Sequence, residues 1–141
     1  MARSGIVLVL TATLVAGVDL AHKATAILER GTAVPAHDRS VAYVIGIAVA
    51  ATAWACAIAL TRSASIALGG GVLAGGAAGN LVSLALWPSL AGVPNPLVAG
   101  DVAFNVADVA VAAGLVLVLA ATCVHAARNR ERLREPVRFR A

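Results

Sequence analysis

Residues 66–87 read IALGGGVLAGGAAGNLVSLALW, an apolar run long enough to cross a lipid bilayer as a single helix. Three further apolar runs accompany it along the chain: Gly5 to about Ile27, Val41 to Leu60, and Val102 to about Val124. With 60% hydrophobic residues, 13% charged residues and a mean hydropathy of +0.90, the 141-residue chain has too little polar surface for a water-soluble globule. The sequence therefore predicts an all-α membrane protein, a bundle of four transmembrane helices that forms one domain over residues 1–127.

The basic residues predict how this bundle is oriented. Eight of them lie before the first span, between the second and third, or after the fourth: Arg3, Arg62, Arg128, Arg130, Arg132, Arg134, Arg138 and Arg140. Three lie on the opposite side: Lys23, Arg30 and Arg39. By the positive-inside rule, both the N and C termini are cytoplasmic. The basic tail, residues 128–141, is expected to touch anionic headgroups of the lipid bilayer, and no groove-reading pattern indicates nucleic-acid binding.

Four polar side chains lie at a common depth within the predicted spans. With a helix rise of about 1.5 Å per residue, Asp19 and Asn80 lie roughly 20 Å above the cytoplasmic ends of their helices. The fourth span runs inward, so Asn105 and Asp108 lie about 5 to 10 Å below the outer surface. Polar groups at such depths are costly and tend to face a bundle interior or water. The sequence thus predicts a buried polar site that opens outward.

Two spacings predict contacts between or within the helices. Asp19 and Lys23 are four residues apart, so we expect them to form an ion pair on one helix face. Gly71, Gly75 and Gly79 recur at every fourth residue, which gives a smooth face that a neighbouring helix can approach closely.

The cysteines and histidines do not indicate a metal site or another cofactor. Cys56 and Cys123 lie singly in two different spans, without a C-x-x-C spacing, and are interpreted as small packing residues. His22, His37 and His125 are scattered at span edges or in loops. We therefore expect no metal, no cofactor and no disulfide.

Three of these segments together resemble the motifs of a known family. Gly75-Gly76-Ala77-Ala78-Gly79-Asn80, Phe104-Asn105-Val106-Ala107-Asp108 and Asp19-Leu20-Ala21-His22-Lys23 are similar, in this order, to those of lipoprotein signal peptidase (signal peptidase II), a four-helix membrane aspartic endopeptidase. The resemblance implies residence in a bacterial-type inner membrane and cleavage of signal peptides from lipid-modified preproteins. It implies that Asp108 is one catalytic carboxyl and that Asn80 and Asn105 position the substrate, whereas Asp19 and Lys23 are interpreted as a structural pair.

The second catalytic carboxyl is not assigned by the same motifs. An aspartic dyad needs two carboxyls that share a proton. The chain offers either Asp101 as the partner of Asp108 or, in its place, Asn95, whose amide cannot exchange a proton. In a continuous helix Asp101 would lie about 10 Å along the axis from Asp108, and a break near Phe104–Asn105 would shorten that distance. The chain also has Ser83-Leu84 where the family has Asp-Arg.

Two other hypotheses remain open at this point. The chain could be a non-catalytic relative that keeps the substrate groove of the family and binds lipopeptides or a partner helix without hydrolysis. Ser83, Leu84 and Asn95 favour this hypothesis. It could also be a small proton-linked transporter, a class that only the buried acids suggest. The loop from Trp87 to Val102 contains prolines and glycines, and we expect it to be mobile and to lack regular structure. The sequence does not predict an oligomeric state.

Overall fold

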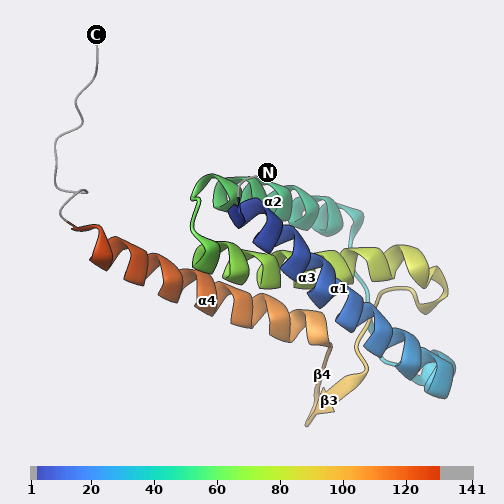
Figure 1. The fold of residues 1–141 in the computed structure, drawn as a ribbon. Helices are drawn as coiled ribbons and strands as arrows, with labels where there is room; N and C mark the ends of the chain where they lie inside the picture. Colours follow the sequence, from blue (N-terminus) through green and yellow to red (C-terminus); the bar gives the residue numbers. More distant parts are fainter. Residues whose placement is uncertain (1–2, 131–141) are drawn as a thin grey trace.

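The computed structural model describes residues 3–130, except for the side chain of Val41, and is dominated by four long helices (Figure 1). These are α1 (Arg3–Arg30), α2 (Val41–Leu60), α3 (Ala64–Leu86) and α4 (Val106–Arg128). Each is long and apolar enough to cross a membrane. The four-helix prediction is therefore confirmed. The predicted tail, residues 128–141, lies outside the described residues except for its first three.

Helix α3 packs against all three other helices through its glycines. A Cβ atom added to Gly75 would lie 2.6 Å from the Ala12 carbonyl oxygen of α1, and one added to Gly76 would lie 2.6 Å from the Ala107 carbonyl oxygen of α4. Gly71 and Gly79 face α1 in the same way. The predicted close approach along Gly71, Gly75 and Gly79 is confirmed, with α1 as the neighbouring helix.

Helix α2 is anchored to the bundle at one end only. Ile58 contacts Gly70 of α3 and is the only buried side chain among the described residues of α2. It belongs to a cluster of buried apolar residues from all four helices: Leu8, Ile58, Ile66, Ala67 and Val118. Because the rest of α2 contributes no buried side chain, its other half is free to form the wall of a groove.

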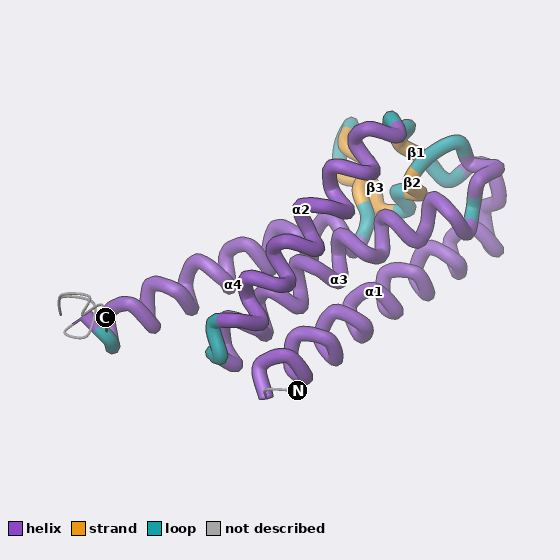
Figure 2. Tube along the Cα trace, turned by 90° about the horizontal axis from the view of Figure 1, so that it is seen from above, coloured by secondary structure: helices purple, strands orange, loops and turns teal. Residues whose placement is uncertain are grey.

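The loops at the opposite end of the bundle contain short strands, as Figure 2 shows. We call this end, formed by residues 31–40 and 87–105, the capped end. It contains two short 3-10 helices, η1 (Gly31–Ala33) and η2 (Pro88–Leu90). Strand β1 (Ala36–His37) pairs antiparallel with β2 (Val93–Pro94), and β3 (Leu97–Ala99) pairs antiparallel with β4 (Val102–Phe104). The expectation that the loop from Trp87 to Val102 lacks regular structure is wrong, because strand pairing satisfies backbone groups that local propensity would leave free.

The fourth helix begins four residues later than predicted. Val102–Phe104 forms strand β4, and Asn105 is the N-cap of α4. The Asn105 side chain accepts a hydrogen bond from the backbone N–H of Asp108, and the Asp108 side chain accepts one from the backbone N–H of Asn105. This reciprocal capping box fixes the start of the helix. The prediction of Val102 as the first residue of the span was therefore wrong, because apolar strand residues continue the hydropathy of the helix.

Candidate functional site

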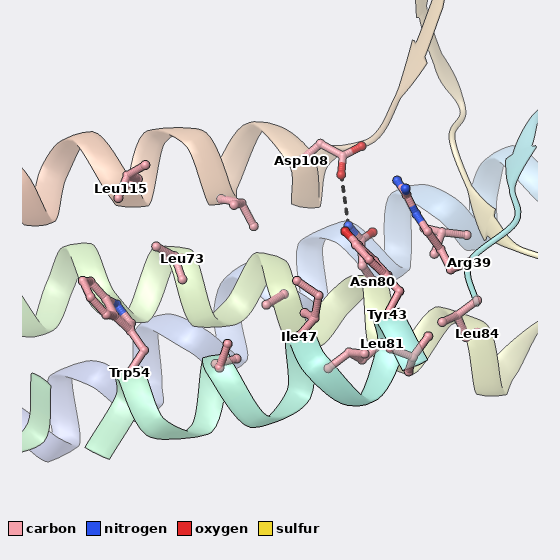
Figure 3. A pocket seen from close by; sticks show the side chains of 16 residues that line it. Arg39, Tyr43, Ile47, Trp54, Leu73, Asn80, Leu81, Leu84, Asp108 and Leu115 are labelled. Atoms are coloured by element: carbon pink, nitrogen blue, oxygen red, sulfur yellow. Dashed lines mark hydrogen bonds between the residues drawn. The ribbon is translucent and has the colours of Figure 1, made fainter. Parts of the chain in front are cut away.

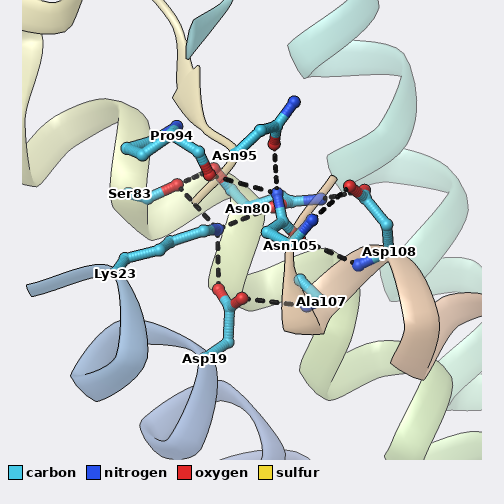
Figure 4. Close-up of polar contacts among 9 residues, drawn as sticks. All are labelled: Asp19, Lys23, Asn80, Ser83, Pro94, Asn95, Asn105, Ala107 and Asp108. Carbon is cyan, nitrogen blue, oxygen red and sulfur yellow. Dashed lines mark hydrogen bonds and ion pairs between the residues drawn. The ribbon is translucent and has the colours of Figure 1, made fainter. Parts of the chain in front are cut away.

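The polar site is built around a buried ion pair on α1 (Figure 4). Lys23 Nζ lies 2.7 Å from Asp19 Oδ2, and both side chains have 0% exposure. The predicted pair is thus confirmed. The other carboxylate oxygen, Asp19 Oδ1, accepts a hydrogen bond of 2.8 Å from the backbone N–H of Ala107 in the first turn of α4. A carboxylate is stabilised at a helix N-terminus, where backbone N–H groups lack partners. Asp19 therefore joins α1 to the start of α4.

The Lys23 ammonium extends this link from α1 to α3. Its Nζ donates to Asn80 Oδ1 at 2.8 Å and to Ser83 Oγ at 3.3 Å, in addition to its contact with Asp19. An ammonium has three N–H donors, so these three acceptors match its full capacity. Ser83 in turn donates to the Asn80 carbonyl oxygen at 2.8 Å. Lys23 is therefore a saturated structural cation.

Asn80 connects the lysine to the carboxylate of Asp108. Its Nδ2 donates to Asp108 Oδ1 at 3.0 Å, while Asp108 Oδ2 accepts the N–H of Asn105 at 3.1 Å. The predicted site residues Asp19, Lys23, Asn80, Asn105 and Asp108 are thus brought into one network. Within it, Asp108 holds a capping box together and accepts one hydrogen bond on each oxygen.

Asn95, and not Asp101, lies beside Asn105. Asn105 Nδ2 donates to Asn95 Oδ1 at 2.6 Å and to the Pro94 carbonyl oxygen at 3.3 Å. Asn95 is buried and donates to the Ala103 carbonyl oxygen at 3.4 Å. The position next to the network is therefore occupied by an amide.

Asp101 is not brought to the network. It is exposed at the tip of the β3–β4 hairpin, between the paired residues Ala99 and Val102. Gly100 precedes it with a φ of 59°, as in a two-residue turn that starts with glycine. The three residues of β4, which advance about 3.3 Å each, separate Asp101 from Asn105. A break in the helix between Asp101 and Asp108 does occur, and it leaves Asp101 in the exposed turn of the hairpin.

A groove lies next to the network, between α2, α3 and α4 (Figure 3). Its volume is about 420 Å³. Its walls are apolar, and Figure 3 shows three polar side chains together at its capped end: Arg39, Asn80 and Asp108. The opposite end contains Trp54 and Leu115. Asp108 and Asn80 therefore belong to the buried network and also line the groove.

Sequence reasoning missed the contribution of α2 to this groove. In the sequence analysis Arg39 served only as one of the basic residues that predict the orientation of the bundle. In the structure it lines the capped end of the groove, with its guanidinium carbon 4.9 Å from the centre of the Tyr43 ring. An arginine followed four residues later by an aromatic residue at the start of a span is the signal that could have indicated it. Among residues 3–130, no group of three His, Cys, Asp or Glu side chains is placed to hold a metal ion.

Comparisons with known proteins found no relative. No protein-family model matches the chain, and searches of curated proteins and of solved structures gave no match.

Proposed function

We propose that this chain is a non-hydrolytic membrane protein, similar in plan to signal peptidase II, that holds the lipid-modified end of a preprotein in its groove. In this proposal the termini are cytoplasmic, the capped end faces outward, and the membrane is a bacterial-type inner membrane. The observation that carries the proposal is an apolar groove whose polar end contains one carboxylate from residues 3–130, that of Asp108. The apolar walls would receive an acyl chain, and the polar end would receive the peptide to which the chain is attached.

The length and lining of the groove favour an acyl chain as the occupant. From Tyr43 to Trp54 the groove follows eleven residues of α2, a length of about 16 Å. Beyond the polar side chains of its capped end, the walls are formed by apolar side chains that include Ile47, Leu73 and Val111. Such walls offer no hydrogen-bond partner to an extended peptide backbone, which is costly to bury unpaired. A hydrocarbon chain needs no such partner.

The carboxyl groups favour binding without hydrolysis. Shared-proton chemistry needs two carboxyls in contact, so that one can hold a proton while the other accepts one from water. Among the described residues, Asp108 is the only carboxyl that lines the groove, and the buried side chain beside Asn105 is the amide of Asn95. Asp19 is committed to its pair with Lys23. The described residues therefore supply one half of a dyad.

A second candidate is the aspartic endopeptidase itself, with Asp108 as one carboxyl and Asp101 as the other. The specific observation that favours it is that Asp108 and Asn80 are hydrogen-bonded to each other at the groove surface, where a substrate peptide would lie. This candidate requires Asp101 to leave the hairpin tip.

Photocrosslinking distinguishes these functions. A photoreactive side chain is placed at Ile47 or Val111, which line the groove, and the matched controls carry it at Ile45 or Val109, which are 58% and 53% exposed and lie outside it. The purified protein in detergent is incubated with a synthetic diacylglyceryl-modified preprotein. We expect full-length preprotein to be trapped at Ile47 and Val111 and not at the controls. Equal labelling at all four positions would refute groove binding, and release of the signal peptide, lost in Asp108→Asn, would establish the endopeptidase instead.

A further inference from the structure

Two opposite charges lie at the capped end of the groove without neutralising each other through direct contact. Arg39 and Asp108 both line it, Arg39 from the segment that precedes α2 and Asp108 from α4 (Figure 3). Among the described residues, Arg39 makes no ion pair and no hydrogen bond, and its guanidinium rests on the Tyr43 ring. Asp108 accepts one hydrogen bond on each oxygen. A carboxylate has about four acceptor positions, so Asp108 retains capacity for a further donor.

We propose that the groove binds an aminophospholipid, with one acyl chain between α2, α3 and α4, the phosphate at Arg39 and the primary ammonium at Asp108. This inference rests on the proposed function, because it names a resident ligand of the same groove that a lipid-modified preprotein would displace. The two charges indicate the headgroup, and the apolar walls of the groove indicate an acyl chain.

The guanidinium of Arg39 is suited to the phosphate. Arginine presents a planar set of N–H donors that matches phosphate oxygens, and stacking on an aromatic ring orients it without using those donors. Two other cations lie nearby and are unsuited to this role. Lys23 has 0% exposure, and its three donors are directed to Asp19, Asn80 and Ser83. Arg30 donates to the Pro96 carbonyl oxygen at 3.1 Å and does not line the groove. The anion-binding group of the groove is therefore Arg39.

The carboxylate of Asp108 discriminates among lipids that share a phosphate. An anionic headgroup without an amine would bring its charge close to Asp108 and would be repelled. A quaternary ammonium carries no N–H and cannot donate to the carboxylate. A primary ammonium both balances the charge and donates a charge-assisted hydrogen bond. Phosphatidylethanolamine is the simplest lipid with a phosphate and such an amine.

The position of the charges agrees with a lipid that keeps its usual orientation in the bilayer. The apolar part of the groove runs about 16 Å from Tyr43 to Trp54. One leaflet provides about 15 Å of hydrocarbon, half of a core about 30 Å thick. A lipid with its headgroup at the capped end therefore reaches the floor of the groove near Trp54 with one chain.

Native mass spectrometry of delipidated protein tests the proposal. The protein is titrated with phosphatidylethanolamine, its N-methylated series up to phosphatidylcholine, and phosphatidylglycerol, all with identical acyl chains. We expect phosphatidylethanolamine to bind about tenfold more tightly than phosphatidylcholine or phosphatidylglycerol, with affinity falling as N–H donors are replaced by methyl groups. Arg39→Gln should weaken phosphatidylethanolamine binding about tenfold. The groove-filling Val111→Trp should abolish binding, whereas its control Val109→Trp should leave it unchanged. The role of Asp108 is tested through the lipid series, which alters only the ligand. A substitution at Asp108 is not needed, so the test does not depend on whether such a variant folds.

The outcomes separate this inference from the proposed function. Equal affinity for the three headgroups, or no effect of Arg39→Gln, overturns the aminophospholipid site. If phosphatidylethanolamine does not compete with crosslinking of the lipid-modified preprotein at Val111, the inference fails while the proposed function stands. If neither ligand reaches Val111, both fail.

Discussion

Replacing Lys23 by methionine removes the cation that joins α1 to α3 and pairs with Asp19, which in turn contacts α4. Lys23 is fully buried, and its Nζ contacts Asp19 at 2.7 Å, Asn80 at 2.8 Å and Ser83 at 3.3 Å. Methionine has similar length and no charge, so the change leaves the Asp19 carboxylate buried without its counter-ion. Removing one partner of a buried ion pair costs about 3–5 kcal/mol. We expect Lys23→Met to lower the free energy of unfolding by that amount.

A double-mutant cycle separates the ion pair from simple loss of packing. Asp19→Asn leaves the lysine charge unpaired and should cost a similar amount. The amide oxygen introduced at position 19 can still accept from the Ala107 N–H, which Asp19 Oδ1 now accepts at 2.8 Å. The double variant Asp19→Asn/Lys23→Met therefore contains no buried charge from the pair, and it should be more stable than either single variant.

Reversible unfolding in mixed detergent micelles, followed by far-UV circular dichroism, gives these free energies. The reasoning is refuted if Lys23→Met unfolds within about 1 kcal/mol of the wild type, the range of an exposed ion pair. It is also refuted if the two single costs add in the double variant, because residues that act as a pair are not additive.

Three further changes test other parts of the structure. Gly75→Ala should cost about 1–3 kcal/mol of unfolding free energy in the same assay, because its Cβ would lie 2.6 Å from the Ala12 carbonyl oxygen. The control is Gly46→Ala, because Gly46 has open space around it. Equal effects of the two changes would disprove the close packing at Gly75. Ser83→Ala should cost about 1.5–3 kcal/mol, because it removes a hydrogen bond to the buried ammonium of Lys23, which keeps its two shorter contacts. A loss larger than that of Lys23→Met would show that the serine dominates. Asp101→Asn should change neither the unfolding free energy nor preprotein crosslinking, and loss of crosslinking would instead place this exposed hairpin residue at the site.

The features that the sequence predicted depend on spacing within one helix. The hydropathy of residues 66–87 and the other apolar runs determines where helices occur. The four-residue spacing of Asp19 and Lys23 determines their pairing. The four-residue repeat of Gly71, Gly75 and Gly79 determines a face for α1. Helical geometry alone fixes such relations, so they can be derived before any tertiary contact is known.

The features that the sequence did not predict depend on partners that are distant along the chain. The strand Val102–Phe104 is as apolar as the helix that follows it, and its pairing with Leu97–Ala99 decides the difference. From the sequence, the position of Asp101 depends on whether residues 101–108 form a continuous helix or one with a break. In the structure, the turn between β3 and β4 determines it. Arg39 becomes part of a groove only because α2 is anchored through Ile58 at its other end. None of these three relations follows from a regular residue spacing within one helix.

The most direct test of the central claim is the intact mass of a diacylglyceryl-modified preprotein after prolonged incubation with the purified protein in lipid nanodiscs. Our account predicts a complex of one protein with one full-length preprotein, because in it the apolar groove receives an acyl chain and the part of the chain that the structure describes presents one carboxyl there, Asp108. A mass that corresponds to the released signal peptide, or the absence of any complex at saturating preprotein, would contradict it.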